Sequence, residues 1–408
     1  MTKPLEGIRV IELGAFIAGP FAARLLAEFG AQVIKVEPLY GDQIRKWGLH
    51  ANGQDSYWSM IQTRNKRSIS VDLHTFEGQD IVRELVKNAD VVLENFKPGT
   101  LAKWRLSHEE MKELNPKLVI TSITGFGQTG PYHNRPGFGN IAESMGGMRY
   151  LTGFPDRPPV RVGLSVGDSI AALYAVIGTL LSLYQRDIGG GEKGQLVDVA
   201  LYEAVYSLLE GIVPEYAHMN KVRERTGNQL AATAPSNIYK TKDGKYVAIG
   251  ANSDSLFNRL MRLMGRDDLA RDPSLQDNMG RVSEVERLDQ AIEAWTSQHE
   301  MQELLALLNQ NEIPAGPIYS IADIMADEHY QARKMFVKMQ DSRVGEIVMP
   351  GIVPKLSETP GGVEWVGPPC GAHTEEVLAE LGFSPKEISE WLNKGVIRQA
   401  VTGTGSPS

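Results

Sequence analysis

Short β-branched runs alternate with helical patterns along the first half of the chain, and this alternation constrains the fold more than any other feature. A run of Val and Ile over 8–14 precedes a helical pattern at 18–30 that ends in a glycine, and 31–37 is again strand-like. Further strand patterns lie at 68–73, 90–96, 118–126 and 195–201, and further helical patterns at 76–89, 108–116, 169–185 and 202–213. Such alternation predicts a parallel, doubly wound α/β sheet.

The character of the sequence changes near residue 225, where a second domain is expected. The later patterns are a polar stretch at 221–235, a hairpin at 237–250, helices over 255–310, a second hairpin at 334–351 and a helical tail at 374–395. A hairpin followed by helices predicts a smaller α+β domain over 225–325. The final residues, 401–408, read VTGTGSPS, and we expect them to be disordered.

Composition places the chain among ordinary globular proteins and excludes several classes. Of its 408 residues 42% are hydrophobic and 23% charged. The formal net charge of −8 argues against a nucleic-acid partner. Cys370 is the only cysteine, which fits a reducing compartment. The N-terminus lacks the apolar core of a secretory signal, and the longest apolar run, Ile170–Leu183, is shorter than the ~20 residues of a membrane span. We therefore expect a cytoplasmic protein without a membrane partner.

The cofactor motifs that can be tested from sequence are absent or incomplete. GFGQTG at 125–130 matches the dinucleotide fingerprint, but Pro131 and Pro136 follow it and oppose the helix that the fingerprint requires. No phosphate-binding Walker motif occurs, and no His or Cys cluster has the spacing of a zinc site. We expect no metal and no tightly bound cofactor.

One acid, Asp168, stands at the head of a long apolar helical pattern in VGLSVGDSIAALYAVIG (162–178). The pattern is apolar on nearly every face, which predicts a buried helix. A buried carboxylate is costly unless its charge is stabilised, and a helix N-terminus stabilises it. An ionised, positioned carboxylate is a competent nucleophile, although aspartate is also a favoured helix N-cap.

The same stretch contains a second motif, because 163–167 spells G-x-S-x-G, the nucleophile elbow of serine hydrolases. That interpretation makes Ser165 the nucleophile and needs an acid and a histidine downstream. The available histidines are His218, His299, His329 and His373. The residues alone leave a nucleophilic aspartate, a helix cap and a serine acyl hydrolase as open alternatives.

Blocks along nearly the whole chain resemble the class III coenzyme A transferases, a family that includes formyl-CoA transferase, carnitine CoA-transferase and α-methylacyl-CoA racemase. The blocks read LEGIRVIELGAFIAGPFAARLLAEFGAQVIKVEP, RNKRSISVDL, ADVVLENFKPGTL, ITGFGQTGPY and VGDSIAALYA. The resemblance implies a large Rossmann-like domain formed by 1–224 and 326–408, a small domain at 225–325, and two protomers interlocked as a homodimer.

The resemblance also implies a reaction. CoA moves from a donor acyl-CoA, for which succinyl-CoA is common among relatives, to a small carboxylic or dicarboxylic acid, through an aspartyl anhydride and an aspartyl-CoA thioester. The alternative within the family is a 2-methylacyl-CoA racemase. Phe138 stands where that branch has its histidine base, and phenylalanine cannot carry a proton, so a transferase is expected.

The family's functional residues map onto particular positions of this chain. The catalytic nucleophile corresponds to Asp168. The implied coenzyme A contacts are Phe16, Ile17, Ala18, Val71, His74, Asn95, Phe96, Lys97, Lys103 and Arg135. Backbone N–H groups of a glycine-rich loop are suited to hold the oxyanions of acyl transfer, and Gly125, Gly127 and Gly130 are the expected donors.

Overall fold

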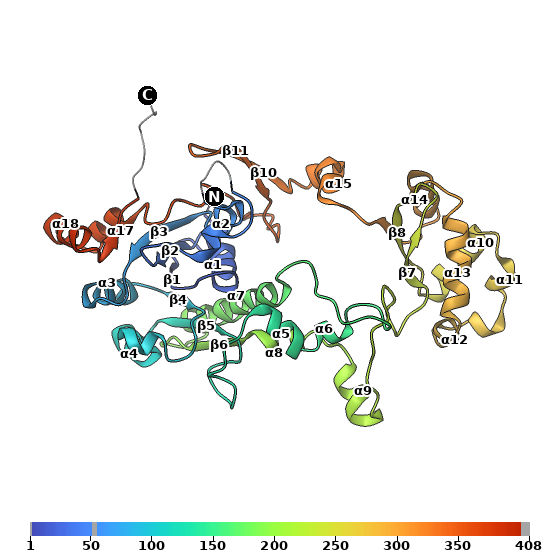
Figure 1. The fold of residues 1–408 in the computed structure, drawn as a ribbon, viewed down its shortest axis with the longest axis horizontal. Helices are drawn as coiled ribbons and strands as arrows, with labels where there is room; N and C mark the ends of the chain where they lie inside the picture. Colours follow the sequence, from blue (N-terminus) through green and yellow to red (C-terminus); the bar gives the residue numbers. More distant parts are fainter. Residues whose placement is uncertain (1, 51–54, 401–408) are drawn as a thin grey trace. The chain divides into compact units, whose positions relative to one another are not determined.

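A computed structural model describes residues 2–50 and 55–400 (Figure 1), so the tail predicted at 401–408 lies outside the described residues. The chain packs into two compact units. The larger is drawn from Met1–Met148, Val162–Pro214 and Ala332–Ser408, and the smaller from Arg149–Arg161 and Glu215–Gln331. The domain boundaries expected from the sequence stay a prediction, because compact packing does not test whether either part folds by itself.

The larger unit is built on a seven-stranded sheet in the order β12-β3-β2-β1-β4-β5-β6. The strands are β1 (Arg9–Glu12), β2 (Gln32–Glu37), β3 (Lys66–Val71), β4 (Val91–Glu94), β5 (Val119–Thr124), β6 (Leu196–Ala200) and β12 (Ile397–Arg398). All pairs are parallel except that of β12 with β3. The predicted parallel α/β sheet is confirmed. Its order reverses direction between β1 and β4, the point at which such sheets bind ligands.

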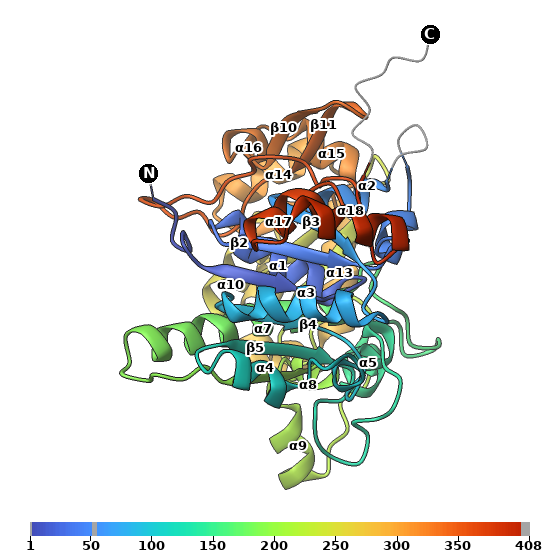
Figure 2. The same cartoon turned by 90° about the vertical axis from the view of Figure 1, so that its left-hand side faces the viewer.

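Helices cover both faces of this sheet, which is why its strands are apolar almost throughout. One face carries α3 (Phe76–Lys87), α4 (His108–Leu114), α17 (Thr374–Glu380) and α18 (Pro385–Lys394), and the other carries α1 (Ala18–Glu28) and α7 (Val166–Asp187) (Figures 1 and 2). The buried face of α1 consists largely of alanines, so α1 and α7 pack closely against each other. Short elements complete the unit: η1 (Gln43–Lys46), α2 (Tyr57–Gln62), η2 (Leu101–Trp104), α5 (Gly139–Met145), α8 (Leu201–Tyr206), β10 (Phe336–Asp341) and β11 (Gly345–Pro350).

Two expectations about helices are wrong. The helix predicted at 202–213 is divided into α8 and α9 (Ile212–Met219), and the break contains Glu210 in a left-handed conformation (φ 49°) followed by Gly211. The helix predicted to be buried, α7, has only one of its faces buried within the described chain. Small side chains such as Ala171 and Ala175 pack against α1 and β5, whereas Leu181 and Tyr184 are each 64% exposed.

Among the described residues, α7 is also the one helix long and apolar enough to cross a membrane by length and composition. Its small-residue face instead belongs to the core that α1 and the sheet share. The helix therefore packs as part of a globular core.

The smaller unit joins a three-stranded antiparallel sheet to a group of helices. The sheet has the order β7 (Ser236–Lys240), β8 (Tyr246–Gly250), β9 (Ala315–Pro317), which confirms the hairpin predicted at 237–250. The other elements are α6 (Met148–Leu151), α10 (Asp254–Leu263), α11 (Asp267–Ala270), η3 (Pro273–Leu275), α12 (Asn278–Ser283), α13 (Val285–Thr296), α14 (Met301–Gln310), α15 (Ile321–Ala326) and α16 (Glu328–Ala332). The second predicted hairpin, at 334–351, is present as β10 and β11.

A buried ion cluster joins three parallel strands of the larger unit. Lys35 on β2 donates to Glu12 on β1 (2.7 Å) and pairs with Asp42 (2.9 Å), and Lys66 on β3 donates to the second oxygen of Glu12 (2.6 Å). Burial by itself lowers the pKa of Lys35, but Asp42 and Glu12 outweigh it and raise that pKa, whereas burial lowers the pKa of Lys66 to about 8. Because an unpaired buried charge is costly, the cluster holds the three strands in register.

A second buried pair fixes the segment that follows β2. Arg45 donates to both oxygens of Glu37 (2.7 and 2.6 Å), and Ser68 on β3 donates to the same carboxylate (2.6 Å). Burial alone raises the pKa of Glu37, yet the Arg45 guanidinium and then Lys35 hold it at about 2. The charged form of Glu37 is therefore part of the folded structure.

We expect Glu37→Gln to lower the free energy of unfolding by about 3 kcal/mol at neutral pH, because it removes one charge of this buried pair. The pKa of Glu37 falls from 4.5 to about 2 on folding, so this contribution is present above pH 4.5 and is lost as the pH falls toward 2. Urea unfolding across that range should show a flatter pH dependence for the variant. Glu84→Gln, at an exposed pair with Lys87, is the control, and equal slopes for the wild type and Glu37→Gln would contradict the assignment.

Candidate active site

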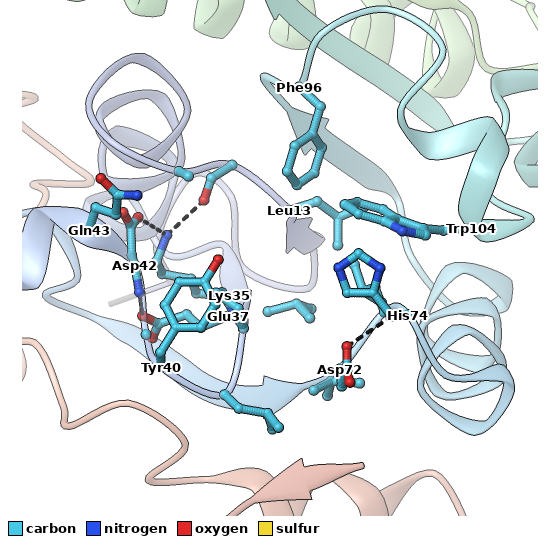
Figure 3. A pocket seen from close by; sticks show the side chains of 18 of the residues that line it. Leu13, Lys35, Glu37, Tyr40, Asp42, Gln43, Asp72, His74, Phe96 and Trp104 are labelled. Carbon is cyan, nitrogen blue, oxygen red and sulfur yellow. Dashed lines mark hydrogen bonds and ion pairs between the residues drawn. The ribbon is translucent and has the colours of Figure 1, made fainter. Parts of the chain in front are cut away.

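A cavity of about 440 Å³ lies at the carboxyl ends of β1, β2, β3 and β4, beside the point where the strand order reverses (Figure 3). Each strand contributes the residues that follow it. The lining comprises Leu13–Phe16, Lys35–Gln43, Val71–His74, Phe96 and Trp104. A concave, partly apolar site at this position of a doubly wound sheet is the expected place for a ligand.

Aromatic rings form one side of the cavity. The ring of Trp104 meets Phe96 edge to face (5.2 Å, 87°) and His74 in the same manner (5.8 Å, 90°). Figure 3 shows the three rings gathered together, apart from the side occupied by Lys35 and Asp42. Flat side chains in this arrangement suit a planar heteroaromatic ring.

The loop between β1 and α1 forms the next part of the wall. Phe16 has a left-handed backbone (φ 63°), which is uncommon for a residue other than glycine. Its N–H donates to Asp42 (3.1 Å), and the preceding Ala15 is bonded to the side chain of Asn95. This wall is therefore held by two side chains from outside the loop, Asp42 after β2 and Asn95 after β4.

Asp168 lies in the first turn of α7, two residues inside the helix. The N-cap is Ser165, whose side chain makes no capping bond, so the N-cap interpretation of Asp168 is wrong. The N–H of Gly167 donates to Glu143 on α5 (3.3 Å), and a Cβ at Gly139 would collide with the Asp168 carboxylate. Only glycine at the start of α5 leaves room for that carboxylate.

Two aromatic side chains in contact link the cavity to the surroundings of Asp168. The ring of Phe16, which lines the cavity, meets the ring of Phe138 edge to face at 5.8 Å. Phe138 directly precedes Gly139, on which the Asp168 carboxylate packs. The contacts from Phe16 to Phe138 and on to Gly139 therefore lead from the cavity to Asp168.

The predicted coenzyme A contacts fall into two groups. Phe16, Val71, His74 and Phe96 line the cavity. Ile17, Ala18, Asn95, Lys97, Lys103 and Arg135 do not line it. Ile17 and Ala18 lie where the loop wall leads into α1, and Asn95 bonds that loop. The three cations, Lys97, Lys103 and Arg135, are exposed, and Arg135 stacks over Tyr132 at 3.6 Å.

The glycine-rich loop after β5 is closed at its base. Gly125 packs against Gly137, where a Cβ would lie 2.9 Å from the opposite Cα, and Gly127 is left-handed (φ 80°). The next N–H, that of Gln128, donates to Asp198 on β6 (3.0 Å), and the space around Gly130 is open. The role of Gly125, Gly127 and Gly130 as hydrogen-bond donors to an oxyanion stays a prediction.

The alternative centred on Ser165 finds no support within the larger unit. His373 is the one of the four proposed histidines that belongs to this unit. Its Nδ1 accepts a bond from the Ser68 N–H (3.2 Å), and burial lowers its pKa. The polar neighbours of His373 are Ser68, Arg67 and Glu376, which tie its ring to β3 and α17 rather than to Ser165.

Several residues of the cavity were missed in the sequence. Asp42 and Gln43 follow β2, and Trp104 follows β4, so the rule that ligands bind beyond the carboxyl ends of strands could have found them. Among residues 2–50 and 55–400, no group of three or more His, Cys, Asp or Glu side chains is placed to hold a metal ion.

The fold and the cavity together define an α/β protein with a cavity at the switch point of its sheet. The model of CoA-transferase family III matches residues 5–374, and the chain belongs to that family. The resemblance seen in the sequence is thereby confirmed, and the protein is a CoA-transferase that uses CoA thioesters.

Full-length relatives and a solved structure agree. The chain is 47% identical to a succinyl-CoA–D-citramalate CoA-transferase of Chloroflexus aurantiacus, over 97% of this chain and 98% of the relative. It is 38% identical to a succinate–glutarate CoA-transferase of Agrobacterium fabrum, over 93% and 96%. A CaiB/BaiF family protein from Brucella suis superposes with a TM-score of 0.82 at 37% identity, over 93% and 100%.

We expect Gly139→Ala to lower kcat by about a hundredfold, because the added methyl group displaces the Asp168 carboxylate. Gly362→Ala, at a glycine where an added Cβ would meet no atom within 4 Å, is the matched control and should leave kcat unchanged. Steady-state kinetics of both variants, with melting temperatures to show that they fold, make the measurement. Equal activity of the two variants would show that Asp168 tolerates displacement.

Proposed function

We propose that this protein transfers CoA from succinyl-CoA to a short dicarboxylic acid, with 2-hydroxy dicarboxylates of the malate and citramalate type as the first acceptors to test. Support comes from relatives whose names join succinyl-CoA to D-citramalate, L-malate and glutarate, at 47%, 42% and 38% identity. The observation that carries the proposal is the cavity with its wall of aromatic rings, from which contacts through Phe16 and Phe138 lead to Asp168.

The proposed binding mode places the nucleotide of CoA in the cavity. The adenine ring packs against Phe96, His74 and Trp104, and the pantetheine arm runs past Phe16 toward Asp168. The exposed cations Lys97, Lys103 and Arg135 are available for the phosphates, since charge-assisted contacts to phosphate are strong even at a surface.

The proposed reaction proceeds by nucleophilic catalysis at Asp168. Its carboxylate attacks the thioester carbonyl of succinyl-CoA, the C–S bond breaks, and a mixed anhydride and CoA thiolate form. The thiolate attacks the aspartyl carbonyl, which releases succinate and leaves aspartyl-CoA. The acceptor carboxylate attacks that thioester, and the released thiolate attacks the acceptor carbonyl of the new anhydride, which restores Asp168 and yields the product thioester.

Each of these steps passes through a tetrahedral oxyanion. Fixed N–H donors stabilise such an oxyanion more than they stabilise the ground-state carbonyl. The backbone N–H groups at Gly125, Gly127 and Gly130 are the proposed donors, because the loop that carries them returns at Gly137 to Phe138 and Gly139. The negative charge of Asp168 itself is favoured by the N-terminal turn of a long helix.

We expect Asp168→Ala to lower the transfer rate by at least about a thousandfold, roughly 4 kcal/mol of barrier, because it removes the atom that carries both covalent intermediates. Ser165→Ala is the matched control in the preceding turn and should keep most of the activity. Transfer is measured by mass spectrometry of new thioesters, with several donors and a panel of acids.

Trapping distinguishes the alternatives directly. Incubation with succinyl-CoA and then hydroxylamine should convert Asp168 to a hydroxamate. Hydrolysis without an acceptor that is lost in Ser165→Ala and kept in Asp168→Ala would refute the transferase mechanism in favour of a serine acyl hydrolase. Exchange of deuterium into the α-carbon of a 2-methylacyl-CoA would favour the racemase.

We further propose that the active form is a homodimer, in the cytoplasm. Leu173, Ile177, Leu181 and Tyr184 present large apolar side chains on one side of α7, between 48% and 64% exposed in the described chain. An apolar face of this extent on a helix is typical of a surface that another chain covers.

Leu181→Asp should therefore weaken the dimer by about thirtyfold or more, because it places a charge in the proposed interface. Light scattering over a range of protein concentrations measures the effect. Lys394→Asp, at an exposed position of α18 on the other side of the sheet, is the control. A stable, fully active wild-type monomer would overturn the proposal.

A further inference from the structure

Asn95 follows β4 and was expected to contact coenzyme A. We infer instead that Asn95 is a positioning residue, which holds the left-handed turn at Phe16 and thereby sets the path from the cavity to Asp168. The inference rests on the proposed function, because it concerns how the same site is kept ready for transfer.

The side-chain amide of Asn95 is engaged with the backbone of one residue. Its Oδ1 accepts the N–H of Ala15 (2.8 Å), and its Nδ2 donates to the C=O of Ala15 (2.8 Å). The amide thus imitates a neighbouring strand, bonding both polar groups of Ala15 at once. The next residue, Phe96, lines the cavity, whereas Asn95 does not.

Two glycines shape the slot that receives this amide. A Cβ at Gly14 would lie 3.4 Å from Asn95 Oδ1, and a Cβ at Gly19 would lie 3.4 Å from Asn95 Cγ. The same two glycines pack against each other, since a Cβ on either would lie 3.1 Å from the other's Cα. The amide therefore fits closely between the end of β1 and the first turn of α1.

The groups on either side of Ala15 are bonded to buried charges. The C=O of Gly14 accepts from Lys35 (2.8 Å), and the N–H of Phe16 donates to Asp42 (3.1 Å), which itself pairs with Lys35 (2.9 Å). Four successive backbone groups, from the Gly14 carbonyl to the Phe16 N–H, are thus held by side chains from other segments. Figure 3 shows Lys35 and Asp42 together on this side of the cavity.

These hydrogen bonds hold the left-handed backbone turn at Phe16. A side chain other than glycine is disfavoured in the left-handed region, so the turn persists only where the surroundings hold it. In that conformation the Phe16 ring lies between Trp47 (5.3 Å) and Phe138 (5.8 Å) and lines the cavity. Without Asn95 the turn relaxes and the ring moves, so the bound thioester loses its alignment with Asp168.

The two roles for Asn95 predict different kinetics. A residue that contacts the nucleotide affects nucleotide binding, whereas one that holds the Phe16 turn affects the chemical step. The test is to measure kcat and KM for succinyl-CoA and, by calorimetry, the Kd of adenosine 3′-phosphate 5′-diphosphate, which is the nucleotide part of CoA.

Asn95→Ala should lower kcat by about ten- to a hundredfold, because misplacement of a reacting group is costly, while the nucleotide Kd changes by less than about threefold. Asn95→Asp keeps the acceptor for the Ala15 N–H and loses the donor to its C=O, so an intermediate loss of kcat is expected. Because Asn95→Asp is nearly isosteric with the wild type, it also provides the test if Asn95→Ala does not fold.

Two control variants separate the effects. Phe96→Ala removes a ring from the cavity wall and should weaken the nucleotide Kd by about tenfold, which sets the effect expected from loss of a direct nucleotide contact. Asn115→Ala removes another asparagine that donates to two backbone carbonyls, those of Val86 (3.1 Å) and Ala89 (2.7 Å), away from the cavity. It should lower the melting temperature and leave kcat unchanged.

The outcomes are distinguishable. A nucleotide Kd that weakens in Asn95→Ala by the same factor as kcat/KM, with kcat unchanged, would overturn the inference in favour of a direct contact. Kinetics of Asn95→Ala equal to those of Asn115→Ala would overturn it in favour of a purely structural role. A wild-type protein that transfers CoA from no donor to any acid would instead overturn the proposed function.

Discussion

The larger unit depends on one buried carboxylate, that of Glu12, which two lysines on neighbouring strands share. Lys35 and Lys66 bond its two oxygens at 2.7 and 2.6 Å, and all three residues are fully buried. The same ammonium groups donate to the carbonyls of Gly14 and Pro20, at either side of the turn into α1. Because none of these charges can lose its partner without a large penalty, the cluster fixes the register of β1, β2 and β3 together with the loop that lines the cavity.

Close approach of backbones is the second constraint on the site. Gly139 and Gly167 let α5 and α7 meet where the Asp168 carboxylate lies, and Gly14 and Gly19 let β1 and α1 meet beside Asn95. In both places a methyl group would meet a functional side chain or the backbone that holds it. Ordered backbone and small residues thus position the polar groups, which is how a site becomes rigid before its ligand arrives.

Much of the fold could be predicted because it is carried by local patterns. The alternation of β-branched and helical stretches predicted the parallel sheet, and the acid at the head of an apolar helix drew attention to Asp168. One helix was predicted over 202–213, and its division into α8 and α9 was missed because nothing in the sequence around Glu210 indicates its left-handed conformation. The exposed face of α7 was missed because an apolar pattern is the same whether this chain or another covers it.

The sequence by itself determined the family, the layered α/β architecture and the residue types available for acyl transfer, because periodicity, turn residues and motif order are properties of the chain read in one dimension. Only the tertiary structure decided which residues meet. Asn95 bonds Ala15 across 80 positions of the chain, Phe16 meets Phe138, and Trp104 joins His74 in the cavity wall. Such contacts follow from the order of strands in the sheet and the direction of their carboxyl ends. Neither strand order nor strand direction can be predicted from a local sequence pattern.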